Sequence, residues 1–153
     1  MHQSSGHSHT AAKRTSPFEL DCGPATNVIV YLEDNEDDSY LLRHALKSAG
    51  VPCRLEVIGT PLAARSFLTE YAPKAPDLIV CDLGLAGTCG LDLLDWIRRQ
   101  SHLEAVPIIL VTGALSCAQR DRARQIGVNA CVEKSVDSRE LTDQIQRFLE
   151  PMA

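Results

Sequence analysis

Acidic, hydroxyl and amino side chains stand at or directly after the ends of short apolar runs in the sequence. Glu33 and Asp34 follow VIVYL, Asp82 follows LIVC, Thr112 closes IILVT, and Lys134 follows ACVE. If these runs are parallel strands, their carboxyl ends meet at one edge of a sheet, where such folds place their reactive sites. Three carboxylates held close together repel one another unless a cation lies between them, and an all-oxygen ligand set suits Mg²⁺.

The same residues supply the groups that phosphoryl transfer requires. A carboxylate such as Asp82 can act as a nucleophile and become an aspartyl phosphate. A metal ion and the ammonium of Lys134 can neutralise the phosphoryl oxygens, and the hydroxyl of Thr112 can sense the new group. Each residue alone is better explained as a helix cap, a turn residue or solvated surface, and it is their joint occurrence in this order that favours a site.

The segments that must position these residues are of two kinds and alternate from Asn27 onward. Short runs, several of them apolar throughout, have the length of strands that are covered on both faces; they are Val28–Leu32, Leu55–Ile58, Leu78–Cys81, Ile108–Thr112 and Ala130–Glu133. Longer stretches repeat apolar residues at helical spacing; they are Asp37–Ala49, Pro61–Tyr71, Leu91–Arg99, Cys117–Ile126 and Ser138–Leu149. We therefore predict an α/β domain with a parallel, doubly wound sheet between two layers of helices.

Composition and charge restrict the class of protein and its partners. The 153 residues fit one domain, and 44% hydrophobic with 23% charged residues is an ordinary globular composition. A net charge of -5 argues against a nucleic-acid-binding face. The longest apolar run, Ala105–Val111, is too short to span a membrane, and Met1–Thr15 lacks a signal-peptide pattern. We expect no nucleic-acid or membrane partner, a cytoplasmic location and reduced cysteines.

The first 26 residues differ in composition from the rest of the chain. They are rich in Ser, Thr, Gly and His and lack periodicity, which predicts a flexible tail. His2, His7 and His9 leave weak metal contact open as an alternative to a solvated tail. The predicted division is a tail over residues 1–26, a domain over 27–150 and a short C-terminal end over 151–153.

Four segments of the chain resemble the bacterial response-regulator receiver family, over essentially all of Asn27–Leu149. They are VIVYLEDNEDD, DLIVCDLGLAGTCGLDLLDWIR, VPIILVTGA and GVNACVEKS. The resemblance implies a flavodoxin-like sheet of five parallel strands in the order 2-1-3-4-5, with five helices. It also implies a two-component signalling switch that takes a phosphoryl group from a sensor histidine kinase or phosphotransfer protein and then signals by protein–protein contact.

Matched residue by residue, the family's site falls on six positions of this sequence. The resemblance implies that Asp82 is the phospho-acceptor, that Lys134 binds the phosphate and that Thr112 is the switch hydroxyl. It implies a Mg²⁺ site of Asp82, Asp34 as a direct ligand, Glu33 acting through water, and the backbone carbonyl of Gly84. Three positions depart from the family pattern. Ala86 and Ser135 stand where Pro is common, and Cys131 stands where the family has an aromatic residue that moves together with the switch hydroxyl.

The partner-facing surface and the kind of receiver also follow from the resemblance. Because the chain ends soon after its last predicted helix, we expect a stand-alone receiver. Its docking face is expected on the fourth helix, fifth strand and fifth helix, and this face carries Arg120, Arg122, Arg124, Arg139, Gln146 and Arg147. A solvated surface, a docking surface and a homodimer contact all stay open for it. EDNEDD and SHLEAVPIILVTG also resemble stand-alone receivers that accompany sensor kinases, including phytochrome-type kinases.

Two other functions are consistent with parts of the pattern. A small phosphatase with an aspartyl-phosphate intermediate usually has a second Asp two residues after the nucleophile, where this chain has Gly84. A receiver-like adaptor that is never phosphorylated would need none of the acidic set, and Cys131 keeps this alternative open. We expect no enzyme activity beyond the chain's own phosphoryl transfer and dephosphorylation.

Overall fold

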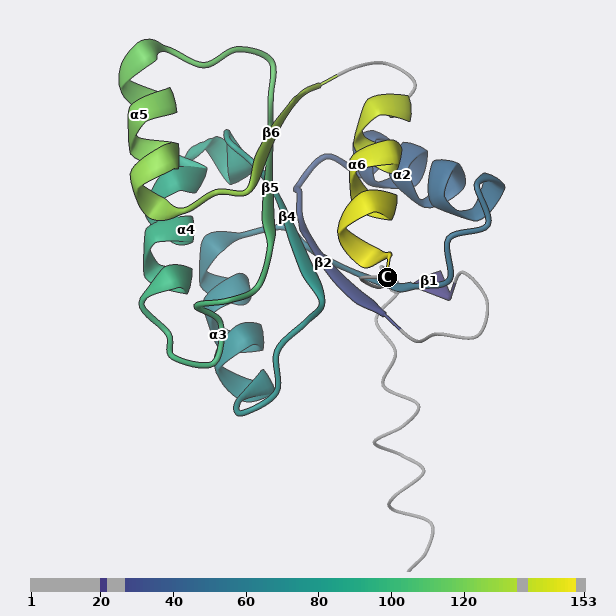
Figure 1. Ribbon diagram of the computed structural model, residues 1–153, viewed down its shortest axis with the longest axis horizontal. Coiled ribbons are helices and arrows are strands. Elements are labelled where there is room, and N and C mark those ends of the chain that lie inside the picture. The colour runs from purple at the N-terminus through teal and green to yellow at the C-terminus, as the bar shows by residue number, and fades with distance from the viewer. Residues whose placement is uncertain (1–19, 22–26, 135–137, 151–153) are drawn as a thin grey trace, which may run out of the picture.

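A mainly parallel sheet runs through the centre of the molecule (Figure 1). The computed structural model describes residues 20–21, 27–134 and 138–150. Five strands are mutually parallel in the spatial order β3-β2-β4-β5-β6; their bounds are β2 Val28–Leu32, β3 Arg54–Ile58, β4 Leu78–Asp82, β5 Ile108–Thr112 and β6 Ala130–Glu133. Numbered along the chain from β2, this is the order 2-1-3-4-5, which confirms the predicted flavodoxin-like fold.

A sixth, two-residue strand at the outer edge of the sheet was not predicted. Strand β1 (Leu20–Asp21) pairs antiparallel with β3, with Leu20 opposite Leu55 and Asp21 opposite Arg54. It lies inside the region predicted to be a flexible tail. An edge strand such as β3 leaves backbone N–H and C=O groups unpaired, and a short neighbouring segment can satisfy some of them without a sequence signal of its own. The remainder of the predicted tail, residues 1–19 and 22–26, lies outside the described residues, as do residues 151–153.

The helices cover both faces of the sheet, in the two layers that Figure 1 shows. Helices α2 (Glu36–Ser48) and α6 (Arg139–Leu149) pack beside each other on one face. Helices α3 (Pro61–Tyr71), α4 (Gly90–Arg98) and α5 (Cys117–Ile126) form a row on the other. A single 3₁₀ turn, η1 (Leu85–Gly87), precedes α4. None of the helices in the described part of the chain combines the length and the hydrophobicity needed to cross a membrane.

Side-chain caps mark the starts of helices α2, α3 and α5. The side chain of Asn35 accepts the N–H of Asp38 and begins α2 one residue earlier than predicted. Thr60 caps α3, and Pro61 occupies its first turn, as the sequence predicts. Ser116 and Gln119 form a capping box at the start of α5. These caps explain why the starts of α2, α3 and α5 agree with the sequence to within one residue. Over the residues that the structure describes, helices α4 and α6 have no side-chain cap bond, and their bounds follow from the spacing of their apolar residues.

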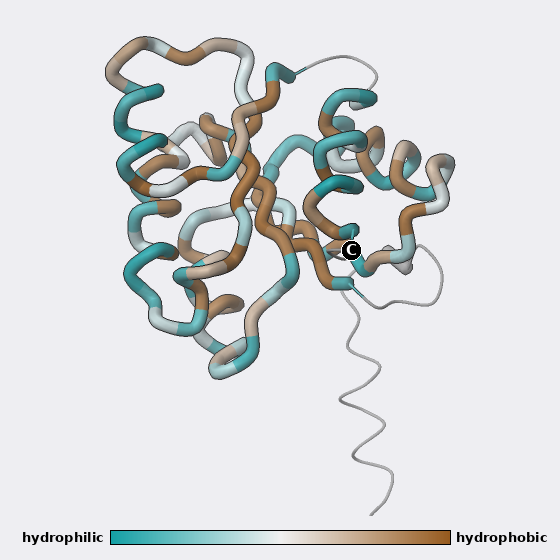
Figure 2. The backbone as a smooth tube through the Cα atoms, in the orientation of Figure 1, coloured by the Kyte–Doolittle hydropathy of each residue, from teal (hydrophilic) through white to brown (hydrophobic). Residues whose placement is uncertain are grey.

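The core lies on both sides of the sheet, because successive strand residues point to opposite faces. In β4, Ile79 packs with the α3–α5 layer and Val80 with the α2–α6 layer, and both are fully buried. Figure 2 shows the strands as a band of hydrophobic residues between helices of mixed polarity. This double cover explains the strands that are apolar throughout. It also leaves the carboxyl ends of the strands as the place where polar side chains gather.

Candidate functional site

Three carboxylates meet at the carboxyl ends of the two central strands. Glu33 and Asp34 directly follow β2, and Asp82 is the last residue of β4. One carboxylate oxygen from each lies within 4.8 Å of the others. Glu33 is buried, Asp82 is partly buried and Asp34 is exposed. The predicted acidic cluster therefore exists, and its donors are oxygen atoms, the ligands that a hard divalent cation such as Mg²⁺ prefers.

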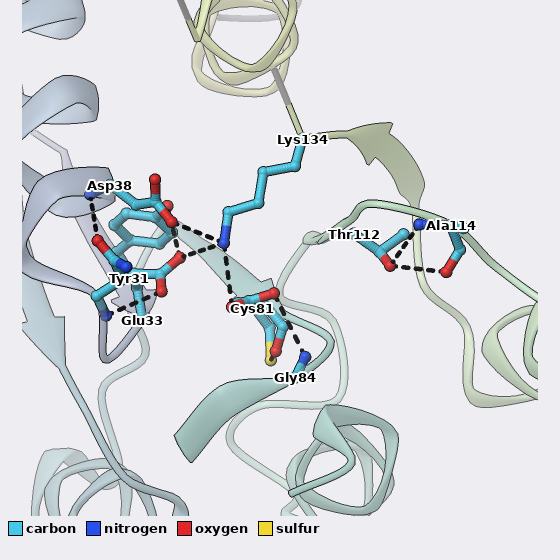
Figure 3. Close-up of polar contacts among 10 residues, drawn as sticks. Tyr31, Glu33, Asp38, Cys81, Gly84, Thr112, Ala114 and Lys134 are labelled. Carbon is cyan, nitrogen blue, oxygen red and sulfur yellow. Dashed lines mark hydrogen bonds and ion pairs between the residues drawn. The ribbon is translucent and has the colours of Figure 1, made fainter. Parts of the chain in front are cut away.

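The ammonium of Lys134 reaches into this cluster from the end of β6 (Figure 3). Its Nζ atom lies 3.3 Å from Oδ2 of Asp82, 3.4 Å from Oε1 of Glu33 and 2.8 Å from Oδ2 of Asp38. The backbone N–H of Lys134 donates to the carbonyl of Thr112, which fixes the base of the side chain. Burial alone would lower the pKa of Lys134, but the hydrogen bond to Asp38 and the charges of Glu33 and Asp82 outweigh burial and raise the pKa above its ordinary value. The side chain is therefore a fixed positive charge beside Asp82.

Glu33 is held by contacts within the protein. Its Oε1 atom accepts from the hydroxyl of Tyr31 at 3.2 Å, and its Oε2 atom accepts from the backbone N–H of Asn35 at 3.0 Å. Burial raises the pKa of Glu33, the N–H of Asn35 opposes this, and the charge of Asp82 raises the pKa further. Both oxygens of Glu33 are thus already engaged, whereas exposed Asp34 has its carboxylate open to solvent.

The loop after Asp82 is stabilised by short-range hydrogen bonds. The N–H of Gly84 donates to Oδ1 of Asp82 at 3.3 Å, and the Gly84 carbonyl accepts the N–H of Gly87 at 3.1 Å. Ala86 has φ 52°, a left-handed conformation. Proline, with φ fixed near −65°, cannot adopt this conformation, so the loop departs from a Pro-containing loop in geometry as well as in sequence. The predicted role of the Gly84 carbonyl as a metal ligand stays a prediction.

Thr112, the last residue of β5, shares a hollow with Asp82 and Lys134. The hollow has a volume of about 500 Å³ and is also lined by Cys89 and Gln119. The hydroxyl of Thr112 donates to the carbonyl of Ala114 at 2.9 Å and so faces away from the acidic cluster (Figure 3). Thr112 therefore lines the same hollow as Asp82 and Lys134. Among the described residues, its hydroxyl bonds to Ala114 and not to either of these two side chains.

The sequence matches the family described as the response regulator receiver domain over residues 29–146. The chain belongs to this family. It is therefore a receiver domain of two-component signalling. One relative is the polar-differentiation response regulator DivK of Brucella ovis, which is 29% identical over 126 residues, or 81% of this chain and 97% of that protein. That relative therefore consists almost entirely of the matched domain.

Solved receivers have the same fold. The Mn²⁺-bound form of response regulator Rcp1 aligns with a TM-score of 0.70 at 27% identity, over 83% of this chain and 97% of that chain. The phosphorylated cyanobacterial phytochrome response regulator RcpA aligns with a TM-score of 0.70 at 24% identity, over 81% of this chain and 94% of that chain. The second likeness shows the fold alone.

One departure of this receiver from its family pattern, Cys131, lies near Thr112. Cys131 is exposed on β6, and with Thr112, Ala114 and Arg120 it lines a second hollow of about 410 Å³. A small side chain thus stands beside open space at the position where the family has an aromatic ring. The other departure, Ser135, lies outside the described residues.

The predicted docking face of the receiver consists of α5, β6 and α6. Arg120 and Arg124 are exposed on α5. Arg122 instead turns toward α4, where its Nη2 atom lies 2.6 Å from Oδ1 of Asp92. Arg122 therefore forms an exposed ion pair between α5 and α4.

Two residues of this receiver site, Asp38 and Tyr31, were not singled out from the sequence. Asp38 lies in the first turn of α2, four residues after Asp34, so the EDNEDD segment contained a signal in its spacing. Tyr31 lies in the middle of an apolar strand and carried no such signal. Only the fold brings its hydroxyl to Glu33.

Proposed function

We propose that this receiver accepts a phosphoryl group on Asp82 from a sensor histidine kinase or a phosphotransfer protein, and then signals to a downstream protein. One observation carries the proposal. The carboxylate of Asp82 lies 3.3 Å from the ammonium of Lys134, belongs to one cluster with the carboxylates of Glu33 and Asp34, and lines an open hollow. A nucleophile, a fixed positive charge and a cation-binding oxygen set are the parts that this transfer requires.

The transfer is a displacement at phosphorus. A carboxylate oxygen of Asp82 attacks the phosphorus of a phosphorylated imidazole, the P–O bond forms while the P–N bond breaks, and the electron pair returns to the imidazole nitrogen. Lys134 turns one N–H from Asp82 to a phosphoryl oxygen. The hydroxyl of Thr112 exchanges the carbonyl of Ala114 for a phosphoryl oxygen, which is the first step of the switch. When bound, Mg²⁺ would neutralise part of the negative charge on the phosphoryl oxygens.

The proposed Mg²⁺ site consists of Asp34 and Asp82 as direct ligands, Glu33 acting through water, and the carbonyl of Gly84. The engagement of both Glu33 oxygens with Tyr31, Asn35 and Lys134 supports the indirect role, because those contacts leave Glu33 less free to bind an ion directly. The manganese-bound form of the similar regulator Rcp1 supports a divalent cation at this kind of site.

The proposal is tested by labelling with a small phosphodonor. With Mg²⁺ present, the intact mass should rise by one phosphoryl group, and Asp82→Asn should abolish the rise. Asp37→Asn, which removes an exposed carboxylate of the neighbouring helix, is the matched control and should label as the wild type does. Equal labelling of the Asp82→Asn variant, or undiminished labelling in excess chelator, would refute the proposal.

The same experiment separates the proposal from its alternatives. An adaptor that is never phosphorylated would show no labelling at all. A phosphatase would hydrolyse added phosphate esters over many turnovers, whereas a receiver would lose phosphate only from its own Asp82. We propose that turnover is confined to the chain's own Asp82, that the protein is cytoplasmic, and that the face of α5, β6 and α6 contacts the downstream protein or a second copy. Exposed Arg120 on this face favours a partner surface with acidic residues, whereas Arg124 is already paired with Asp121 at 3.3 Å.

A further inference from the structure

The ammonium of Lys134 has three partners, and the nearest is a residue with no role in the proposed transfer. Nζ lies 2.8 Å from Asp38, compared with 3.3 Å from Asp82 and 3.4 Å from Glu33. An ammonium has three N–H donors, so these three carboxylates can engage all of them. The backbone of Asp38 is itself fixed, because its N–H donates to the capping side chain of Asn35 at 3.0 Å.

Asp38 and Asp82 lie on different sides of the ammonium. The hollow of about 500 Å³ is lined by Asp82, Thr112 and Lys134, but not by Asp38. On the other side, Asp38 and Lys134 line a cavity of about 20 Å³ together with Tyr31, Val111 and Leu141, with space for a single water molecule. The side chain of Lys134 is 32% exposed and flexible by nature, so without Asp38 its ammonium could turn into the hollow or the solvent.

We propose that Asp38 is a positioning residue that holds the ammonium of Lys134 beside Asp82; the inference rests on the function proposed above. When a phosphoryl group reaches Asp82, one N–H of Lys134 turns to a phosphoryl oxygen. The contacts with Asp38 and Glu33 keep Nζ in place during this exchange. Asp38 acts only through Lys134, and its own charge opposes the approach of an anionic donor. The benefit of positioning exceeds this repulsion. Displacement of the Lys134 ammonium would slow the transfer more than the charge of Asp38 does, because solvent partly screens that charge.

The test is a double-mutant cycle on the rate of phosphorylation by a small phosphodonor at saturating Mg²⁺. Asp38→Ala should lower the limiting rate roughly 10-fold with little change in the donor concentration that gives half the limiting rate. The same substitution should have no further effect in a Lys134→Ala background. Asp38→Asn retains an acceptor oxygen and should recover part of the rate. Asp37→Ala, at the exposed neighbouring position, is the control and should leave the rate unchanged.

Two results would overturn the proposal. A rate in Asp38→Ala equal to or above that of the wild type would mean that the charge of Asp38 only repels the donor. An equal loss in the Lys134→Ala background would mean that Asp38 does not act through Lys134. Thermal unfolding of each variant checks that it is folded, and Asp38→Asn, which keeps the shape of the side chain, carries the test if Asp38→Ala unfolds.

A second measurement is independent of phosphorylation. If the wild type is not labelled at all, the proposed function fails, but the positioning contact can still be examined. Modification of Lys134 by an amine reagent, located by mass spectrometry, should be several-fold faster in Asp38→Ala than in Asp37→Ala. Equal rates of modification in both variants would overturn the positioning role by itself.

Discussion

The first turn of α4 lies so close to the end of β4 that a single methyl group should disturb it. Gly90 is the first residue of α4, and its N–H donates to the carbonyl of Leu83. A Cβ atom at Gly90 would lie 2.8 Å from the carbonyl oxygen of Asp82, 3.0 Å from that of Leu83 and 3.1 Å from Sγ of Cys81. Ordinary contacts of this kind begin at 3.4 Å, so Gly90→Ala forces the helix or the end of the strand to move.

The size of the effect follows from these distances. Inserting a methyl group into a packed site costs about 1–3 kcal/mol when backbone must shift. Replacing Gly by Ala returns about 0.4–1 kcal/mol, because it restricts the unfolded chain. Gly90→Ala should therefore lower the free energy of unfolding by about 1–2 kcal/mol and the Tm by roughly 3–10 °C. The matched control is Gly84→Ala in the same loop, where φ is -95° and the added methyl meets no described atom within 4 Å.

Urea unfolding followed by circular dichroism measures the difference between the two variants. Gly84→Ala should be as stable as the wild type or slightly more so. At a temperature where both variants are folded, Gly90→Ala should also accept phosphate more slowly, since the clash falls on the backbone of Asp82. If Gly90→Ala proves as stable as Gly84→Ala, α4 does not pack as closely against the end of β4 as these distances indicate, and the reasoning is refuted.

Other predictions concern the carboxylates, the loop and the switch. Asp34→Ala should weaken Mg²⁺ binding more than Glu33→Ala, because Glu33 is already engaged within the protein; equal losses in metal titrations would contradict this ligand assignment. The raised pKa of Glu33 means that protonated Glu33 stabilises the fold below pH 4.5 and that this contribution is lost as pH rises through the folded pKa. In chelator, the stability of Glu33→Gln relative to the wild type should therefore increase as pH rises above 4.5, and a constant difference would argue against it. Ala86→Gly should raise the free energy of unfolding by up to about 1 kcal/mol in urea, because φ is 52°; a loss would show that the loop is not left-handed there. Cys131→Tyr should enlarge the hydrogen-exchange response of α5 to a phosphate mimic, since the hollow of about 410 Å³ has room for the ring, unless wild-type α5 already responds as strongly as the loops around Asp82.

Much of the fold and of the acidic site could be predicted from the sequence. Helix α3 was predicted at its observed bounds because Thr60 and Pro61 mark its start through contacts within one turn. The parallel strands were recognisable because each is covered on both faces and reads as a short apolar run. Because the carboxyl ends of parallel strands all lie at one edge of the sheet, the parallel arrangement also predicts that Glu33, Asp34 and Asp82 lie together there.

The tertiary structure decided what depends on contacts between distant segments. Strand β1 forms because the edge of β3 offers backbone partners, and the pairing of Asp38 with Lys134 needs α2 and β6 to be packed in place. The direction of the Thr112 hydroxyl and the left-handed conformation of Ala86 depend on the loops around them. Local patterns specify where elements begin and end, because capping and periodicity act within a few residues. Side-chain partners across the site are instead selected by the packing of the whole domain, which no short segment encodes.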